Sequence, residues 1–179
     1  MVARRSGVLL HGVRLGLPAD AVELVPYDDR WPALYESESA LLRTALAGQI
    51  ESIAHVGSTS ILGMHAKPVI DLMVSVASLR APSLLYWALG RYGYALQGDD
   101  PVGDRLFFIK EMQEQPTHHL SVCEFSSDFW STHLAFRDRL RADANLADDY
   151  LQLKRRLWRD HASIGMRTRR AKPISSRRC

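Results

Sequence analysis

Hydrophobic residues along this chain recur at two spacings, which predicts a mixed succession of helices and strands. Apolar positions three and four residues apart are typical of amphipathic helices, whereas short alternating or continuous apolar runs are typical of strands. The pattern predicts strands over residues 22–26, 50–55, 69–76, 106–110 and 118–123, and helices over residues 29–47, 82–92, 129–141 and 146–158. Asp28 or Asp29 is expected to cap the first helix, and Asp128 the third. This order favours an α/β or α+β fold, with helices packed on one or both faces of a sheet.

The segment 69–76 is the most apolar of the predicted strands, with the sequence VIDLMVSV. Apolar residues fall on both of its faces, which is typical of a central strand covered from both sides. Asp71 interrupts this run. A carboxylate at such a position is unfavourable unless it is paired or binds a ligand, so Asp71 is a candidate functional residue.

Composition and charge limit the domain organisation and the kinds of partner. The 179 residues, 46% of them hydrophobic, suffice for one compact domain with a core. We expect an N-terminal lead-in over residues 1–19, a folded domain over 20–160 and a basic tail over 161–179. The net charge of +3 comes from the two ends, because residues 20–161 hold 14 basic and 20 acidic residues, a formal charge of −6. An acidic body argues against a nucleic-acid partner and leaves the basic ends as the only candidate contact with nucleic acid.

Cysteine usage and hydropathy favour a soluble protein of the cytoplasm. Cys123 and Cys179 have neither the spacing of a metal site nor that of a disulfide framework. No run of about 18 apolar residues occurs, which excludes a predicted membrane-spanning helix. The apolar run near the N-terminus is too short for a signal peptide. We therefore expect a bacterial, cytoplasmic protein.

A turn of small residues, Gly57-Ser58-Thr59, joins the predicted strand 50–55 to the connection that leads into the Asp71 strand. Backbone N–H groups in such a turn can bind phosphate oxygens, and a carboxylate on the neighbouring strand can hold Mg²⁺ against the same phosphates. The alternative is a plain turn beside a hydrogen-bonded structural acid. His55 is a candidate acid or base, or a strand-end histidine bonded to the backbone, and Lys67 is a candidate phosphate ligand or a solvated loop residue.

Several short motifs occur together in an order that resembles one bacterial family. They are VPYDDRW at 25–31, HVGSTS at 55–60, AKPVID at 66–71, RLFFIK at 105–110, THHL at 117–120, FRDRLR at 136–141 after Trp130, and Tyr150 with Leu153 and Lys154. Together they cover about residues 13–158, and the chain resembles the GrpB (UPF0157) family. The resemblance implies a nucleotidyltransferase-like fold, a mixed sheet with helices packed on its faces.

On such a fold, the turn and the Asp71 carboxylate described above predict a nucleotide site and a divalent metal. Gly57, Ser58, Thr59, Lys67, Arg105 and Lys110 would bind a nucleoside triphosphate, and Asp71 and His55 would be the catalytic residues. Arg105 and Lys110 flank a strand, where charges can enter the same cleft or only protect a sheet edge. Active nucleotidyltransferases carry a second carboxylate two residues after the first, but position 73 is Met73. A further ligand could come from His118, His119 or Ser121, of which His119 and Ser121 share one face. Asp71 with His119 would hold a single divalent ion, Mn²⁺ or Zn²⁺ more readily than Mg²⁺, in place of a two-metal clamp.

Two functions follow as expectations. The first is an enzyme that transfers a nucleotidyl group from a nucleoside triphosphate to a small-molecule or protein acceptor, with catalysis reduced by the missing carboxylate. The second is a non-catalytic nucleotide-binding or chaperone-like accessory module, as in relatives fused to dephospho-CoA kinase. The family ends in a further helix, which the Arg-rich tail replaces here. Self-association into a homo-oligomer could cover the surface left open.

Overall fold

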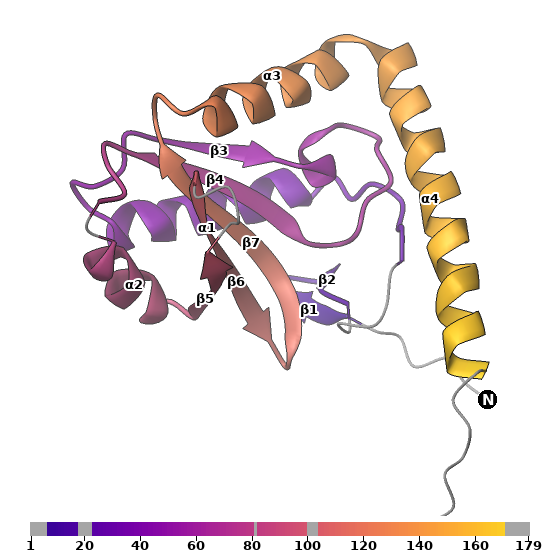
Figure 1. The fold of residues 1–179 in the computed structure, drawn as a ribbon, viewed down its shortest axis with the longest axis horizontal. Coiled ribbons are helices and arrows are strands. Elements are labelled where there is room, and N and C mark those ends of the chain that lie inside the picture. Colours follow the sequence, from indigo (N-terminus) through magenta and orange to yellow (C-terminus); the bar gives the residue numbers. More distant parts are fainter. Residues whose placement is uncertain (1–6, 18–22, 81, 100–103, 171–179) are drawn as a thin grey trace, which may run out of the picture.

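A five-stranded mixed sheet with four helices forms the fold of the computed structural model, which describes residues 7–17, 23–80, 82–99 and 104–170 (Figure 1). The strand order is β3-β4-β7-β6-β5, in which β4 and β7 are parallel and the other neighbours are antiparallel. The sheet consists of β3 (Ser52–Val56), β4 (Ile70–Val76), β5 (Tyr94–Asp99), β6 (Arg105–Met112) and β7 (Gln115–Glu124). The helices are α1 (Trp31–Ala45), α2 (Ser83–Gly90), α3 (Asp128–Ala142) and α4 (Ala144–Arg170), with a short 3₁₀ turn, η1 (Ser58–Ser60). The predicted α+β fold is confirmed.

The two faces of the sheet are covered differently. On one face, α1 and α2 bury the main core, which includes Ile70, Leu72 and Val74 of β4. On the other face, α3 covers a smaller cluster in which Met73 packs with Trp130. Alternate strand residues point to opposite faces, so Asp71 and Met73 lie on the α3 side. Because α3 covers only part of that side, polar side chains of the central strands remain accessible there.

The end of α3 leads directly into α4, which runs down one side of the molecule (Figure 1). The helix continues past residue 158, where the sequence predicted its end, to Arg170. It thereby crosses the boundary expected between the domain and the tail, of which residues 171–179 lie outside the described residues. Within the described part of the chain, no helix is long and apolar enough to span a membrane.

Local predictions differ from the structure at several places. The lead-in contains a hairpin of β1 (Val8–Leu10) and β2 (Val13–Leu15), and the strand predicted at 22–26 is a single bridge between Val25 and Ala66. Strand β5 was not predicted. Ser127, and not Asp128, caps α3, since its hydroxyl accepts a hydrogen bond from the backbone N–H of Trp130. The first helix has Arg30 at its N-cap, without a side-chain cap, so neither Asp28 nor Asp29 has the predicted capping role.

Candidate functional site

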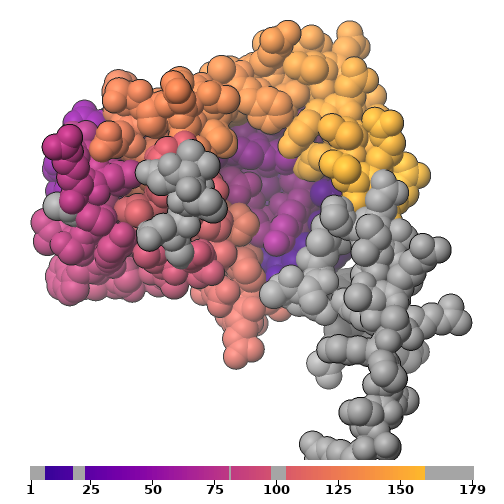
Figure 2. All heavy atoms as spheres, viewed as in Figure 1, coloured from indigo at the N-terminus to yellow at the C-terminus, as the bar shows by residue number. Residues whose placement is uncertain are grey.

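A cavity of about 310 Å³ lies on the α3 side of the sheet, beside the part that α3 covers. Its lining includes Gly57, Asp71, Arg105, Phe107, His119 and Ser121. They come from the end of β3 and from β4, β6 and β7. Figure 2 shows the surface hollowed between α3, α4 and β7, with the purple residues that follow α1 at the bottom of the hollow.

Asp71 and His119 form a hydrogen-bonded pair in this cavity. They are register partners on the parallel strands β4 and β7, and His119 Nδ1 lies 3.0 Å from Asp71 Oδ1. A carboxylate accepts hydrogen bonds, so Nδ1 carries the proton and Nε2 of a neutral imidazole is an acceptor. Both side chains are partly exposed, 35% for Asp71 and 24% for His119. The two residues that the sequence named as metal ligands therefore lie together, on one face, within reach of solvent.

Gly57 lies directly against the Asp71 carboxylate. Its backbone has φ 68° and ψ −175°, a conformation open essentially to glycine alone. A Cβ at this position would lie 2.9 Å from Asp71 Cγ and closer still to Oδ2. The turn after β3 thus requires glycine for two reasons, its dihedral angles and its contact with Asp71.

Arg105 brings a positive charge to the same cavity. Its Nη1 donates a hydrogen bond to Ser121 Oγ at 3.1 Å, and its guanidinium lies 5.1 Å from the ring centroid of Phe107 and 4.8 Å from that of Phe129. Stacking on two aromatic rings holds the planar cation in place. A guanidinium has five N–H donors in a planar fork, an arrangement that matches the oxygens of a phosphate.

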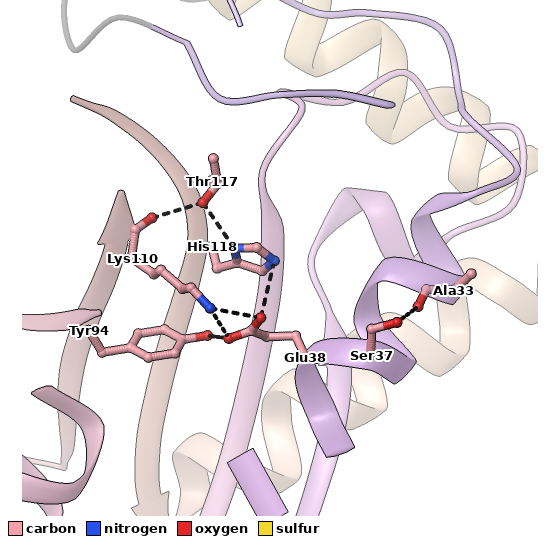
Figure 3. Close-up of polar contacts among 7 residues, drawn as sticks. All are labelled: Ala33, Ser37, Glu38, Tyr94, Lys110, Thr117 and His118. Carbon is pink, nitrogen blue, oxygen red and sulfur yellow. Dashed lines mark hydrogen bonds and ion pairs between the residues drawn. The ribbon is translucent and has the colours of Figure 1, made fainter. Parts of the chain in front are cut away.

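His55 and Lys110 lie on the opposite face of the sheet and do not join Asp71. His55 Nε2 is 3.1 Å from Thr59 Oγ1, and the ring stacks on Tyr35. Burial, assisted by two nearby arginines, lowers the pKa of His55 to about 3, so the imidazole is neutral at pH 7. Lys110 Nζ bonds both carboxylate oxygens of Glu38, at 2.8 and 3.0 Å (Figure 3). Both residues have partners of their own on that face, and their predicted catalytic and nucleotide-binding roles stay predictions.

Thr59 and Lys67, also predicted to bind nucleotide, lie apart from the cavity lining. Thr59 is 1% exposed and its hydroxyl is the partner of His55. Lys67 is half-buried on the connection between η1 and β4. Gly57 is thus the residue of the predicted turn that lies against Asp71, while the Ser58 hydroxyl accepts a hydrogen bond from Lys154 Nζ.

Met73 has the position at which the expected second carboxylate would lie, two residues beyond Asp71. Its side chain is fully buried in the cluster with Trp130 under α3. Among the described residues, no group of three or more His, Cys, Asp and Glu side chains could hold a metal ion. The donor set of Asp71 and His119 suits one divalent ion that takes its other ligands from phosphate and water, and does not suit a two-metal clamp.

Two residues of α4 that the sequence named only as family motif residues, without a site role, reach this region. Lys154 Nζ donates to Ser58 Oγ at 2.6 Å and to the backbone oxygen of His65 at 3.2 Å. The Tyr150 side chain lies beside Ser58, and the charge of Asp71 acts on both α4 side chains. Their spacing could have indicated that Tyr150 and Lys154 act at one place, since residues four apart lie on the same face of a helix.

Known proteins resemble this chain over most of its length. The family model described as "GrpB protein" matches residues 21–172. "UPF0157 protein YqkA" of Bacillus subtilis is 34% identical over 160 residues, which are 89% of this chain and 46% of that protein, so this chain spans less than half of it. "Glutamate-rich protein GrpB" of Alkalihalophilus pseudofirmus is 33% identical over 80% of this chain and 84% of its own.

A solved structure and a longer relative extend the comparison. The crystal structure of conserved protein GrpB from Enterococcus faecalis matches with a TM-score of 0.70 and 30% identity, covering 78% of this chain and 85% of that one. A protein named dephospho-CoA kinase, from Mycolicibacterium paratuberculosis, is 31% identical over 75% of this chain and only 39% of its own length. Sequence motifs, sheet topology and these matches agree, and this chain belongs to the GrpB family.

Proposed function

We propose that this protein binds a nucleoside triphosphate in the Asp71 cavity and transfers the nucleotidyl group to a hydroxyl of a small-molecule or protein acceptor. The observation that carries the proposal is the Asp71–His119 pair, 3.0 Å apart beneath the Gly57 turn and beside Arg105. The cavity therefore combines a carboxylate, an imidazole and a fixed cation. Phosphate esters require such groups for charge neutralisation and proton transfer.

Each residue has a distinct part in this reaction. Arg105 binds phosphate oxygens and stabilises the negative charge that develops on them. His119 Nε2 accepts the proton of the acceptor hydroxyl, while Asp71 holds the imidazole through Nδ1 and stabilises its protonated form. The acceptor oxygen forms a bond to the α-phosphorus, the bond to the β-phosphate breaks, and pyrophosphate leaves. A divalent ion bound by Asp71 and phosphate oxygens would neutralise phosphate charge, and His119 Nε2 would then remain available for the proton.

A second candidate function is nucleotide binding without transfer, as an accessory module. Burial of Met73 supports it, because the site has one carboxylate where the two-metal reaction needs two. The relative named dephospho-CoA kinase, which is much longer than this chain, supports an association with an enzyme of that activity. This candidate keeps the same ligand site and omits only the proton transfer and bond formation.

Binding can be tested by calorimetry with ATP, GTP, CTP and UTP, each with Mg²⁺ or Mn²⁺. We expect one or more nucleotides to bind the wild type, and Asp71→Asn or His119→Asn to weaken binding about 10- to 100-fold, as for loss of a charged hydrogen-bond partner. Asp138→Asn is the matched control, since it removes an exposed carboxylate of α3 that pairs with Arg137. Absence of binding by the wild type, or binding that Asp71→Asn leaves intact, would reject the proposal.

Pyrophosphate release separates the two candidates once binding is established. The assay compares wild type and His119→Asn with each binding nucleotide, using water and a bacterial metabolite extract as acceptors. Release by the wild type that falls in His119→Asn supports transfer. Binding without release supports the accessory module.

A further inference from the structure

Beside the Asp71 cavity, a cation of α4 contacts the turn that follows β3, and neither proposed function uses it. Lys154 reaches from the middle of α4 to the Gly57–Ser58 turn, 96 residues earlier in the chain. Its Nζ has two oxygen acceptors, the Ser58 hydroxyl and the backbone of His65. An ammonium has three N–H donors, so these contacts leave one for a further acceptor.

The surroundings of Lys154 favour an anion as that acceptor. The side chain is half-buried, and burial lowers its pKa, while the Asp71 charge acts in the opposite direction. Among the described side chains, none of the ion pairs found within 4.0 Å joins a carboxylate to Lys154. A partly desolvated cation with only neutral hydrogen-bond partners is stabilised when an anion binds beside it.

The position of Lys154 relates it to the proposed nucleotide. Its partner Ser58 follows Gly57, which lines the cavity against Asp71. Arg105 lines the same cavity from β6, and Lys154 contacts the turn beside that cavity. In Figure 2, α4 forms one wall of the hollow opposite the strands. A chain of phosphates that extends from the cavity along the Gly57–Ser58 turn would therefore meet Lys154.

We propose that Lys154, with Ser58, is the subsite for the terminal phosphates of the nucleoside triphosphate. This inference rests on the proposed function, and it adds that α4 takes part in ligand binding. Tyr150 is a positioning residue of this subsite, because its ring centroid lies 5.6 Å from Lys154 Nζ and its side chain lies beside Ser58. The subsite distinguishes a triphosphate from a monophosphate, which does not extend beyond the α-phosphate.

The test compares binding of the preferred nucleoside triphosphate, its monophosphate and inorganic tripolyphosphate. We expect Lys154→Met to weaken binding of the triphosphate and of tripolyphosphate about 10- to 100-fold, with little effect on the monophosphate. Lys154→Arg should recover part of the loss because it keeps the charge. Arg156→Met is the matched control, since it removes one positive charge from an exposed position of the same helix.

A second measurement needs no variant and so does not depend on folding of Lys154→Met. The chain has four lysines, and amine acetylation of the wild type can be followed at each by peptide mass spectrometry. Tripolyphosphate should slow acetylation of Lys154 and leave Lys110, which bonds Glu38 on the opposite face of the sheet, unchanged.

The outcomes separate this inference from the proposed function. If the wild type binds neither nucleotide nor tripolyphosphate, both fail. If the wild type binds the triphosphate through Asp71, but Lys154→Met binds it equally well and Lys154 is not protected, only the Lys154 subsite is rejected. Equal losses for triphosphate and monophosphate would also reject it, because they would indicate a general effect on the site.

Discussion

Replacing Gly57 by alanine tests the close contact between the turn and Asp71. The backbone at Gly57 has φ 68° and ψ −175°, which a residue with a Cβ adopts at a penalty of about 1–3 kcal/mol. The added methyl would also meet the Asp71 side chain, with Cβ and Cγ both 2.9 Å away, and such overpacking destabilises by about 1–3 kcal/mol. We therefore expect Gly57→Ala to lower the free energy of unfolding by about 2–6 kcal/mol.

Gly63 provides a matched control for this substitution. It has a φ of 75°, and no atom lies within 4 Å of the position a Cβ would take. Gly63→Ala should therefore show only the backbone penalty, about 1–2 kcal/mol. Urea unfolding followed by circular dichroism measures both variants at one temperature. The double variant Gly57→Ala/Asp71→Ala shortens the side chain that meets the added methyl, and it should recover part of the stability lost in Gly57→Ala. Equal losses for Gly57→Ala and Gly63→Ala, or strictly additive effects in the double variant, would refute the contact.

Three further predictions concern residues outside the cavity. Ser127→Ala should lower the free energy of unfolding by about 1 kcal/mol in urea titration, because it removes the cap of α3, and Ser127→Asp should restore most of the loss. Lys110→Met should lower the free energy of unfolding by about 3–5 kcal/mol, because Glu38 would lose its charged partner. Adding Glu38→Gln to that variant should recover part of the loss. A neutral effect of Lys110→Met would contradict the buried pair. Burial lowers the pKa of His118 to about 4 and that of His55 to about 3, below the ordinary value of 6.5. Between these values and pH 6.5, the unfolded chain therefore binds more protons than the folded chain. Stability should therefore be fully present above pH 6.5 and fall as the pH drops toward these values, and His55→Gln should flatten this dependence in unfolding curves measured from pH 7 to 4.

The helices and strands were predictable wherever the local sequence pattern determines them. Strand β4 follows from an apolar run, and the shared face of His119 and Ser121 follows from the alternation of side chains along β7. The same alternation shows that Arg105 and Lys110, five residues apart, point to opposite faces of β6, which the sequence-based prediction overlooked. Strand β5 also alternates, with Tyr94 buried and Ala95 exposed, but it is short and ends in a Gly/Asp-rich segment that resembles a loop.

Pairing between distant segments was not predictable, and it decides which residues share a site. The antiparallel register of β3 and β4 places His55 opposite Leu72, on the face of the main core, and so away from Asp71. Nothing in the sequence near His55 specifies this register, because one residue of slippage would turn the imidazole to the other face. The contact between Lys154 and Ser58 likewise depends on how α4 crosses the turn, which local patterns do not encode.

Met73 shows why the missing carboxylate cannot be treated as a single substitution in an otherwise intact two-metal site. Its side chain is fully buried and packs with Trp130, so it helps to hold α3 against the sheet. An aspartate there would place a charge beneath a helix, where burial without a partner is strongly unfavourable. Regaining the second carboxylate would therefore require α3 to move away from β4. The packing of α3 and the reduced set of metal ligands are one feature of the fold, and any chemistry in the cavity must proceed with Asp71 and His119.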